Sequence, residues 1–344
     1  MTLKSPPLLG PLMIDIAGTT LGETDRARLS HPLVGGVILF ERNYVDPHQL
    51  GDLIRELHAL RAPQLLIAVD HEGGRIQRWR DGFTALPPAS AIGRCYDRDP
   101  DAGLELAYSV GLVSGCEMAA VGVDIVFAPV VDLDFGLSSV IGDRALHREA
   151  EVVAALARAV ADGLRDAGTA AVAKHFPGHG GVIPDTHLEN AVDERDAAAL
   201  FSQDLAPYRD LLPRGVDGVM TAHIRYPAVD SQTATYSRFW IREILRQRFQ
   251  FDGLVFSDDL TMAGAGDAPL PTRVADALRT GIDMVLICNH PEGVVELLAR
   301  SAVPDPRRRA ARRHRWREGI EAGRKVIRED PEYDTARRIV TSRD

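Results

Sequence analysis

Residues 65–70 read LLIAVD, an unbroken apolar run that ends on a carboxylate. Residues 35–40, GGVILF, have the same pattern and are followed by Glu41. Strands that are covered on both faces are apolar at nearly every position, as these runs are. Eight such runs, each ended or interrupted by a polar residue or proline, lie at residues 12–16, 35–40, 65–69, 124–128, 171–173, 218–222, 254–257 and 283–288.

Helical patterns fill most of the gaps between these runs. Apolar spacings of three and four predict helices at residues 47–61, 102–121, 149–167, 193–212, 238–248, 272–280 and 291–300. Strands that alternate with helices pair in parallel through right-handed crossovers. We therefore expect an α/β fold, a single-domain TIM-type (β/α)8 barrel over residues 1–300. A doubly wound open sheet is the alternative, but no GxGxxG follows the first run.

Composition is typical of a soluble globular protein, since 45% of the 344 residues are hydrophobic and 26% are charged. No apolar run approaches the roughly 18 residues of a membrane-spanning helix, and prolines near the start argue against a signal peptide. The three scattered cysteines lack CxxC spacing, which fits a reducing compartment. We expect a cytoplasmic protein that does not contact membranes.

The net charge of −9 is unevenly distributed. Residues 300–344 hold 14 Lys and Arg against 8 Asp and Glu, so the preceding residues are strongly acidic. Nucleic-acid binders present a basic face, which the acidic part does not predict. Basic residues of the tail alternate with Glu and Ala, as in solvated segments. We expect residues 301–344 to be a solvated, helical or partly disordered tail that binds no nucleic acid.

Active sites of β/α barrels lie at the C-terminal ends of the strands. The longest segments between predicted elements follow the third, fourth and fifth runs, and long loops are usually functional. The polar residues at the ends of the runs are therefore candidates for one shared site: Asp15, Asp70, Lys174, His175, His223, Asp258 and Asn289.

Residues 174–187, KHFPGHGGVIPDTH, form the densest cluster of reactive side chains. The Pro-Gly pair excludes a helix, so His175 and His179 do not share a helix face as the ligands of an HExxH site do. Asp185 and His187 could add metal ligands from the loop, and a metal site stays a minor alternative. The other alternative is that these histidines only hydrogen-bond the loop to itself.

Residues 256–262, FSDDLTM, place two adjacent carboxylates after an apolar run. One polar residue among 257–259 is expected to cap the following turn, because free N–H groups there need an acceptor. The other carboxylate is then left to face the site, and Asp258 is the first residue past the run. Ser257, Asp258 and Asp259 are the three candidates for this cap.

Residues 69–80, VDHEGGRIQRWR, combine Asp70 with three arginines, and residues 141–144, IGDR, add Arg144. A carboxylate beside an arginine can hold vicinal hydroxyls, one group accepting and the other donating. A phosphate-binding function is a weak alternative, because the lysine spacing of a P-loop is missing. The whole set suits hydrolysis of a polyhydroxylated substrate. Sugar hydrolysis needs a carboxylate and a proton donor on opposite sides of the anomeric carbon, and Asp258 with the Asp185/His187 pair fits.

KHFPGHG followed by DTH, together with VDHEGGRIQR, FSDDLTM and IGDR, resembles the bacterial β-N-acetylglucosaminidases of glycoside hydrolase family 3. The resemblance covers about residues 10–300, and the chain is most similar to the single-domain cytosolic enzymes of peptidoglycan recycling. Two features depart from that pattern. Ala145 and Leu146 stand where relatives have Ser and an aromatic residue, and the tail after residue 303 has no counterpart.

The resemblance implies a retaining exo-β-N-acetylglucosaminidase acting on muropeptides that carry 1,6-anhydro-N-acetylmuramic acid. It implies that Asp258 is the nucleophile, His187 the general acid/base, and Asp185 the group that orients His187. We also expect a monomer without cofactor or metal. Arg75 is left open between sugar binding and a structural role. The residues that would hold the terminal N-acetylglucosamine are Asp70, Arg78, Arg144, Lys174 and His175.

Three alternatives remain open. A family member could act on chitin fragments or β-glucosides, or use phosphate as the acceptor, in which case phosphate would accelerate turnover. A catalytically inactive sugar-binding barrel is the alternative outside the enzymes. The presence of Asp258, Asp185 and His187 together argues against it, since a binding protein needs no acid/base pair.

Overall fold

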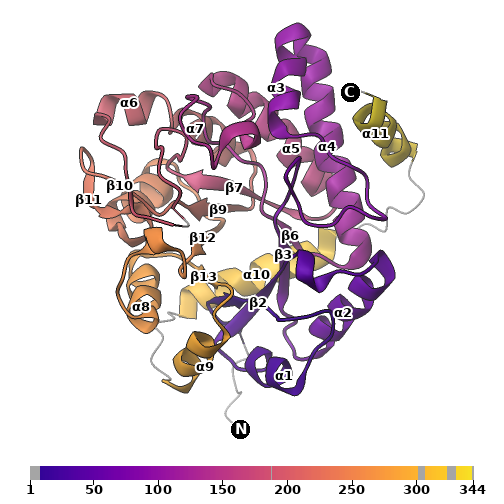
Figure 1. Cartoon of the computed structure of the whole chain (residues 1–344), viewed down its shortest axis with the longest axis vertical. Helices are drawn as coiled ribbons and strands as arrows, with labels where there is room; N and C mark the ends of the chain where they lie inside the picture. The colour runs from indigo at the N-terminus through magenta and orange to yellow at the C-terminus, as the bar shows by residue number, and fades with distance from the viewer. Residues whose placement is uncertain (1–7, 187, 301–306, 324–330, 343–344) are drawn as a thin grey trace.

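The computed structural model describes residues 8–186, 188–300, 307–323 and 331–342. Eight parallel strands close into a barrel, which Figure 1 shows at the centre of the molecule. The barrel strands are β1 (Leu12–Ile14), β2 (Val34–Leu39), β3 (Leu66–Val69), β6 (Ile125–Val126), β7 (Ala170–Phe176), β9 (Gly218–Thr221), β12 (Leu254–Asp259) and β13 (Met284–Ile287). Each predicted run contains or overlaps one strand, so the predicted (β/α)8 barrel is confirmed.

The runs are continuously apolar because both faces of every barrel strand are covered. In β1, Met13 packs into the barrel interior, whereas Leu12 and Ile14 pack into the larger cluster between strands and helices. The rings of Phe127 and Phe256, both in the interior cluster, have centroids 5.4 Å apart. The barrel is therefore a packed core, open to a site only at its ends.

Helices surround the barrel (Figure 1). They are α1 (Glu23–Leu29), α2 (Pro47–Ala59), α3 (Ala89–Arg98), α4 (Pro100–Val121), α5 (Ala150–Asp166), α6 (Ala197–Ser202), α7 (Ala206–Leu211), η5 (Phe239–Arg248), α8 (Leu270–Thr280) and α9 (Pro291–Ala299). The single helix predicted over residues 193–212 is wrong. Asp193 accepts the backbone N–H of Arg195 in a turn, Asp196 caps α6, and a second turn separates α6 from α7.

Helix α4 is, by length and composition, apolar enough to cross a membrane, the one such helix within the described ranges. It packs along α5 and also contacts α3 and α11 (Pro331–Ser342). The helices α4 and α5 approach closely, since a Cβ at Gly111 or Gly163 would collide with the backbone of the other helix. Within its most apolar stretch of 18 residues, 61% is buried inside the protein. The apolar composition of α4 is therefore explained by its packing against other helices.

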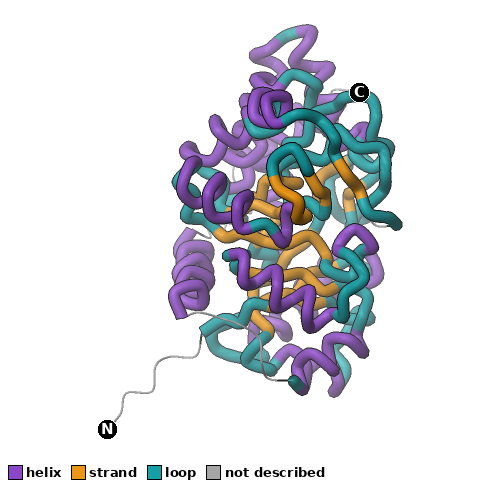
Figure 2. Tube along the Cα trace, turned by 90° about the vertical axis from the view of Figure 1, so that its left-hand side faces the viewer, coloured by secondary structure: helices purple, strands orange, loops and turns teal. Residues whose placement is uncertain are grey.

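Short strands and long loops build the C-terminal end of the barrel. In Figure 2 most of the loops lie on one side of the strands. The hairpin of β4 (His71–Gly73) and β5 (Ile76–Gln77) follows β3. A small sheet of β8 (Ala191–Val192), β10 (Ile224–Tyr226) and β11 (Asp230–Thr233) stands beside the loops after β7 and β9.

Three aspartates precede barrel strands at the opposite, N-terminal end. Asp124, Asp217 and Asp283 each accept a hydrogen bond from a backbone N–H of the neighbouring strand, at 2.8, 3.0 and 3.0 Å. Asp124 and Asp283 are fully buried. Buried carboxylates need a cation or further donors to offset the loss of hydration.

Helix α10 (Arg307–Gly323) lies across this end of the barrel and supplies those cations (Figure 1). Arg317 Nη1 lies 2.5 Å from Asp124 Oδ1. Arg312 Nη1 lies 2.8 Å from Asp283 Oδ1. The expectation that the tail is solvated is therefore wrong for one face of α10, because Arg317 is buried against Asp124 and the half-buried Arg312 pairs with Asp283.

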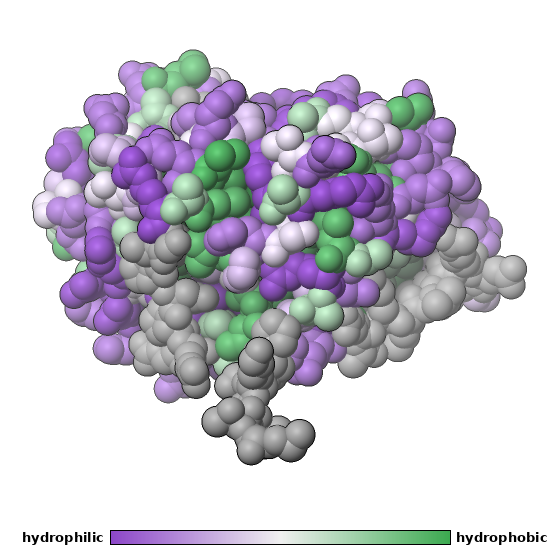
Figure 3. Space-filling view, turned by 90° about the horizontal axis from the view of Figure 1, so that it is seen from below, coloured by the Kyte–Doolittle hydropathy of each residue, from purple (hydrophilic) through white to green (hydrophobic). Residues whose placement is uncertain are grey.

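Arg313 and Trp316 of α10 bind the backbone at the strand starts. The fully buried Arg313 donates to the carbonyl oxygen of Leu9 from Nε and Nη2, at 2.9 and 2.7 Å. The indole of Trp316 donates to the carbonyl of Asp217 at 3.1 Å. The face shown in Figure 3 is mostly hydrophilic, with hydrophobic residues in separate patches.

Candidate active site

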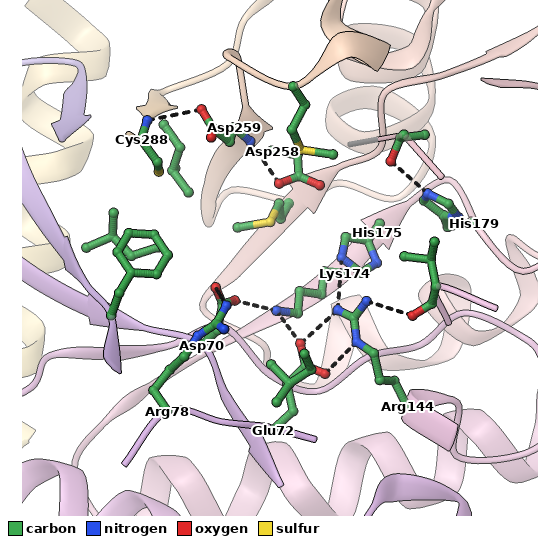
Figure 4. Close-up of a pocket in the computed structure, with 18 of the residues that line it drawn as sticks. Asp70, Glu72, Arg78, Arg144, Lys174, His175, His179, Asp258, Asp259 and Cys288 are labelled. Carbon is green, nitrogen blue, oxygen red and sulfur yellow. Dashed lines mark hydrogen bonds and ion pairs between the residues drawn. The ribbon is translucent and has the colours of Figure 1, made fainter. Parts of the chain in front are cut away.

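A pocket of about 350 Å³ opens at the C-terminal end of the barrel (Figure 4). Ile38, Met220 and Leu286 line it and belong to the packed interior cluster, which closes the pocket below. The structure brings together here the predicted residues Asp70, Arg78, Arg144, Lys174, His175, Asp258 and Asn289. Asp15 and His223 do not line it, because their side chains bind backbone groups around it.

One wall of the pocket is a network of ion pairs. Lys174 Nζ, almost fully buried, lies 2.6 Å from both Asp70 Oδ1 and Glu72 Oε1. Arg78 Nη2 lies 3.3 Å from the other Asp70 oxygen. Arg144 makes two hydrogen bonds of 2.8 Å with Glu72, in the bidentate geometry that suits guanidinium and carboxylate.

The network keeps its carboxylates charged. Burial alone would raise the pKa of Asp70 and Glu72. Lys174 beside both, with Arg78 near Asp70 and Arg144 near Glu72, outweighs burial and holds both pKa values below their usual range. The wall therefore offers fixed acceptors and donors to the hydroxyls of a ligand at neutral pH.

His175 is oriented by a carboxylate behind it. Its Nδ1 lies 2.7 Å from Asp132 Oδ2, and the same carboxylate accepts the backbone N–H of His179 at 2.7 Å. This hydrogen bond leaves the Nε2 of His175 on the side of Arg144, 3.5 Å from its Nη2. His175 therefore presents one ring nitrogen to the pocket, with its orientation set by Asp132.

His179 serves the loop. Burial lowers its pKa to about 4, so the ring is neutral near pH 7, and its Nε2 lies 3.0 Å from Thr186 Oγ1. The proposal that loop histidines bond the loop to itself is therefore correct for His179. Within the described ranges, no three His, Cys, Asp or Glu side chains are grouped as a metal would require.

Asp258 and Asp259 have different surroundings. Asp259 accepts hydrogen bonds from Thr261 N at 2.9 Å, from Thr261 Oγ1 at 2.7 Å and from Cys288 N at 3.1 Å. Burial outweighs these bonds and raises the pKa of Asp259. Asp258 instead points into the pocket, across from Lys174 (Figure 4). One carboxylate of the pair was expected to be structural and the other to face the pocket. The structure assigns the structural role to Asp259, which organises the turn, and the pocket to Asp258.

The loop that leaves β7 reaches the pocket at Thr186, which lines it. The carbonyl of Thr186 accepts the N–H of Gly264 at 2.9 Å, and that of Asp185 accepts two N–H groups that follow it. Asp185 itself is half-buried beside Thr186. The predicted acid/base residue, His187, lies outside the described residues, so its role stays a prediction.

Sequence reasoning missed two residues of the site, Glu72 and Asp132. Glu72 stands two positions after Asp70, and such residues face the same side of an extended chain, so alternation was a usable signal. Asp132 carried no such signal, because its partner His175 is 43 positions away. Arg75, which was left open between sugar binding and a structural role, binds Asp143 at 2.8 Å and carbonyls of the same loop.

Known proteins match this chain along most of its length. Residues 12–314 match the glycosyl hydrolase family 3 N terminal domain. A β-hexosaminidase of Nitrosomonas eutropha is 54% identical over 291 residues, 84% of each chain. Native NagZ from Neisseria gonorrhoeae superimposes with a TM-score of 0.90 at 41% identity, with 98% of both chains covered. The expectation that the tail after residue 303 has no counterpart is therefore wrong. A second structure of NagZ from that organism, at 40% identity with the same TM-score and coverage, is a complex with N-trifluoroacetyl-D-glucosamine. The chain therefore belongs to glycoside hydrolase family 3, among its bacterial β-N-acetylhexosaminidases.

Proposed function

We propose that this hydrolase removes terminal, non-reducing N-acetylglucosamine from muropeptides that carry 1,6-anhydro-N-acetylmuramic acid. It would do so in the cytoplasm, as a monomer without cofactor, during peptidoglycan recycling. The observation that carries the proposal is the position of Asp258. Its carboxylate faces the charged wall across the pocket. The related NagZ from Neisseria gonorrhoeae forms a complex with an N-acetylglucosamine analogue, which supports such a ligand.

The pocket supports removal of a terminal sugar. Because the packed interior of the barrel closes it below, a sugar has access from one side only. The donors and acceptors that would hold its hydroxyls and acetamido group are already paired with one another, so little reorganisation accompanies binding. These are the proposed sugar-binding residues Asp70, Arg78, Arg144, Lys174 and His175.

The proposed reaction has two steps with retention at the anomeric carbon. A carboxylate oxygen of Asp258 attacks that carbon while the bond to the leaving oxygen breaks, and His187 gives this oxygen its proton. His187 then takes a proton from water, which attacks the glycosyl-enzyme and frees Asp258. Asp185 would orient the imidazole and favour its protonated form, as a carboxylate does in a Ser-His-Asp triad.

Aryl β-glycosides that differ only in the sugar test the substrate, with product anomers followed by NMR. We expect turnover of the N-acetylglucosaminide, release of the β-anomer first, and cleavage of the anhydro-disaccharide. The α-anomer appearing first would exclude the covalent route. Acceleration by phosphate, with a sugar phosphate as product, would instead identify a phosphorylase.

Leaving-group dependence tests His187. A sugar hydroxyl is a poor leaving group and needs a proton, whereas nitrophenolate leaves readily as an anion. His187→Ala should therefore lose about 10²–10⁴-fold on the disaccharide and release a burst of nitrophenol from the aryl substrate. Asp185→Asn should show the same pattern more weakly. Equal losses on both substrates without a burst would reduce His187 to a binding residue.

A further inference from the structure

Arg195 is held between two buried carboxylates beside the loop that leaves β7. Its Nε lies 2.9 Å from Asp193 Oδ1, and its Nη2 and Nη1 lie 3.0 and 2.9 Å from the two oxygens of Asp204. Both aspartate side chains are only 1% exposed. The guanidinium carbon also lies 4.6 Å from the ring centroid of Phe135. Arg195 thus joins the segment after β8, the turn between α6 and α7, and the loop after β6.

The loop of residues 177–186 rests directly on this cluster. A side chain at Gly178 would collide with the Asp204 carboxylate, and one at Gly181 would collide with the Arg195 guanidinium. The hydroxyl of Tyr226 donates a hydrogen bond to the Gly178 carbonyl from the same side. The two glycines let the loop backbone approach the cluster closely.

Contacts along the loop connect the cluster of Arg195, Asp193 and Asp204 to the segment that holds Asp185. His179, between the two glycines, donates its backbone N–H to Asp132 and reaches Thr186 with its ring. Thr186 is buried and also accepts the N–H of Gly264. Thr186 directly follows Asp185, so the two contacts on Thr186 fix the chain at the point where the proposed acid/base pair begins.

We propose that Arg195, held by Asp193 and Asp204, is a positioning residue for the acid/base step of the reaction. Its contacts with the loop of residues 177–186 hold Asp185, the residue proposed to orient the acid/base, in place; the inference rests on the proposed function. Only a planar guanidinium can grip two carboxylates in this way, because a lysine ammonium lacks the fork of donors.

The charge of Asp204 allows an effect on catalysis to be distinguished from an effect on stability. Burial raises the pKa of Asp204 to about 6, with Asp193 and Asp132 adding to the effect and Arg195 opposing it; Tyr208 and Tyr226 also face it. Since the folded-state pKa is above the unfolded value, stability falls as the pH rises through that interval. Ionised Asp204 therefore costs stability at neutral pH, and removing its charge should not lower the melting temperature.

The test compares Arg195→Gln, Arg195→Lys and Asp204→Asn with the matched control Glu194→Gln, which removes an exposed charge next to Arg195. For Arg195→Gln we expect kcat on the anhydro-disaccharide to fall about 10–100-fold, as for a small misplacement of a catalytic group. KM should change little, the nitrophenyl substrate should lose less, and lysine should restore part of the loss. Asp204→Asn should lose kcat while melting no lower than the wild type at pH 7.

Contrary results are separable. Equal losses on both substrates, or an Asp204→Asn variant that melts lower with unchanged kcat, would make the cluster structural and overturn the proposal. If Arg195→Gln does not fold, Asp204→Asn alone decides. A wild type that cleaves neither substrate would contradict the proposed function. Backbone amide exchange over residues 177–186 then still tests whether the cluster holds the loop. Exchange should be faster in Asp204→Asn than in Glu194→Gln.

Discussion

The carboxylates of Asp258 and Asp259, neighbours in the chain, do different work. Asp259 joins the turn at Thr261 to the end of β13 through three hydrogen bonds. Asp258 faces the pocket and accepts the backbone N–H of Asp259 at 2.8 Å. The position of the proposed nucleophile therefore depends on the turn that its neighbour organises.

Substitution of the two aspartates should have separate effects. Asp258→Ala should lose nearly all turnover yet bind N-acetylglucosamine, because only the covalent step is removed. Asp259→Asn should lower the free energy of unfolding by about 1–3 kcal/mol, because an amide nitrogen cannot accept the hydrogen bonds that Thr261 and Cys288 donate to this half-buried carboxylate. Calorimetric binding, turnover and denaturant unfolding measure the three effects. The reverse ranking of turnover would assign the nucleophile to Asp259.

The bidentate pair of Arg144 and Glu72 predicts that substrate binding weakens even when a substitution keeps the positive charge. Arg144→Lys keeps the cation but cannot make both hydrogen bonds with the carboxylate. We expect KM for the aryl N-acetylglucosaminide to rise about tenfold, the effect of roughly one lost hydrogen bond. Arg94→Lys, at an exposed position of α3, is the control and should change nothing. An unchanged KM in Arg144→Lys would show that charge alone matters here.

His71 makes the protein sensitive to acid. Burial, with Arg80 and Arg78 adding to it, lowers the pKa of His71 to about 3, and within the described ranges neither ring nitrogen has a hydrogen-bond partner. Since the unfolded chain binds this proton near pH 6.5 and the folded one near 3, stability is full above 6.5 and falls toward 3. His71→Leu should flatten that fall, by up to about 1.4 kcal/mol per pH unit. Melting curves at several pH values check it; parallel curves would contradict it.

Helix α10 should contribute strongly to stability. Arg317→Met leaves Asp124 buried without its cation and should lower the free energy of unfolding by about 3–5 kcal/mol. The exposed Arg315 on the same helix offers the control Arg315→Met, which should melt like the wild type. Turnover per folded molecule should stay unchanged, since α10 lies at the far end of the barrel from the pocket. A normal melting temperature for Arg317→Met would show that α10 is dispensable.

The barrel could be predicted because its strands are covered on both faces. Runs such as residues 35–40 and 65–69 are apolar throughout, and the residues that end them face one site by topology alone. Asp70, Lys174 and Asp258 could be predicted for the pocket on that basis. The specific roles of Asp258, Asp185 and His187 came from the family resemblance.

Other features depend on partners that are distant in the sequence. Asp132 meets His175 across 43 positions, and Arg317 meets Asp124 across most of the chain. Neither pairing leaves a local pattern in the sequence. A basic tail with interleaved acidic residues is therefore predicted to be solvated, although one face of α10 is buried. The choice between Asp258 and Asp259 likewise required knowing that Cys288 lies beside Asp259.

The hydrogen bonds from Arg313 to Leu9 join α10 to the residues before β1 and bear on the order of synthesis. A ribosome makes Leu9 and all eight barrel strands before it makes α10. Until α10 emerges, Asp124 and Asp283 have none of the arginine partners that it supplies, and the start of β1 lacks those donors. The nascent barrel therefore cannot complete its closed end until α10 has been made. A premature stop before residue 307 would release a chain that has every barrel strand but lacks the α10 contacts at the N-terminal end of the barrel.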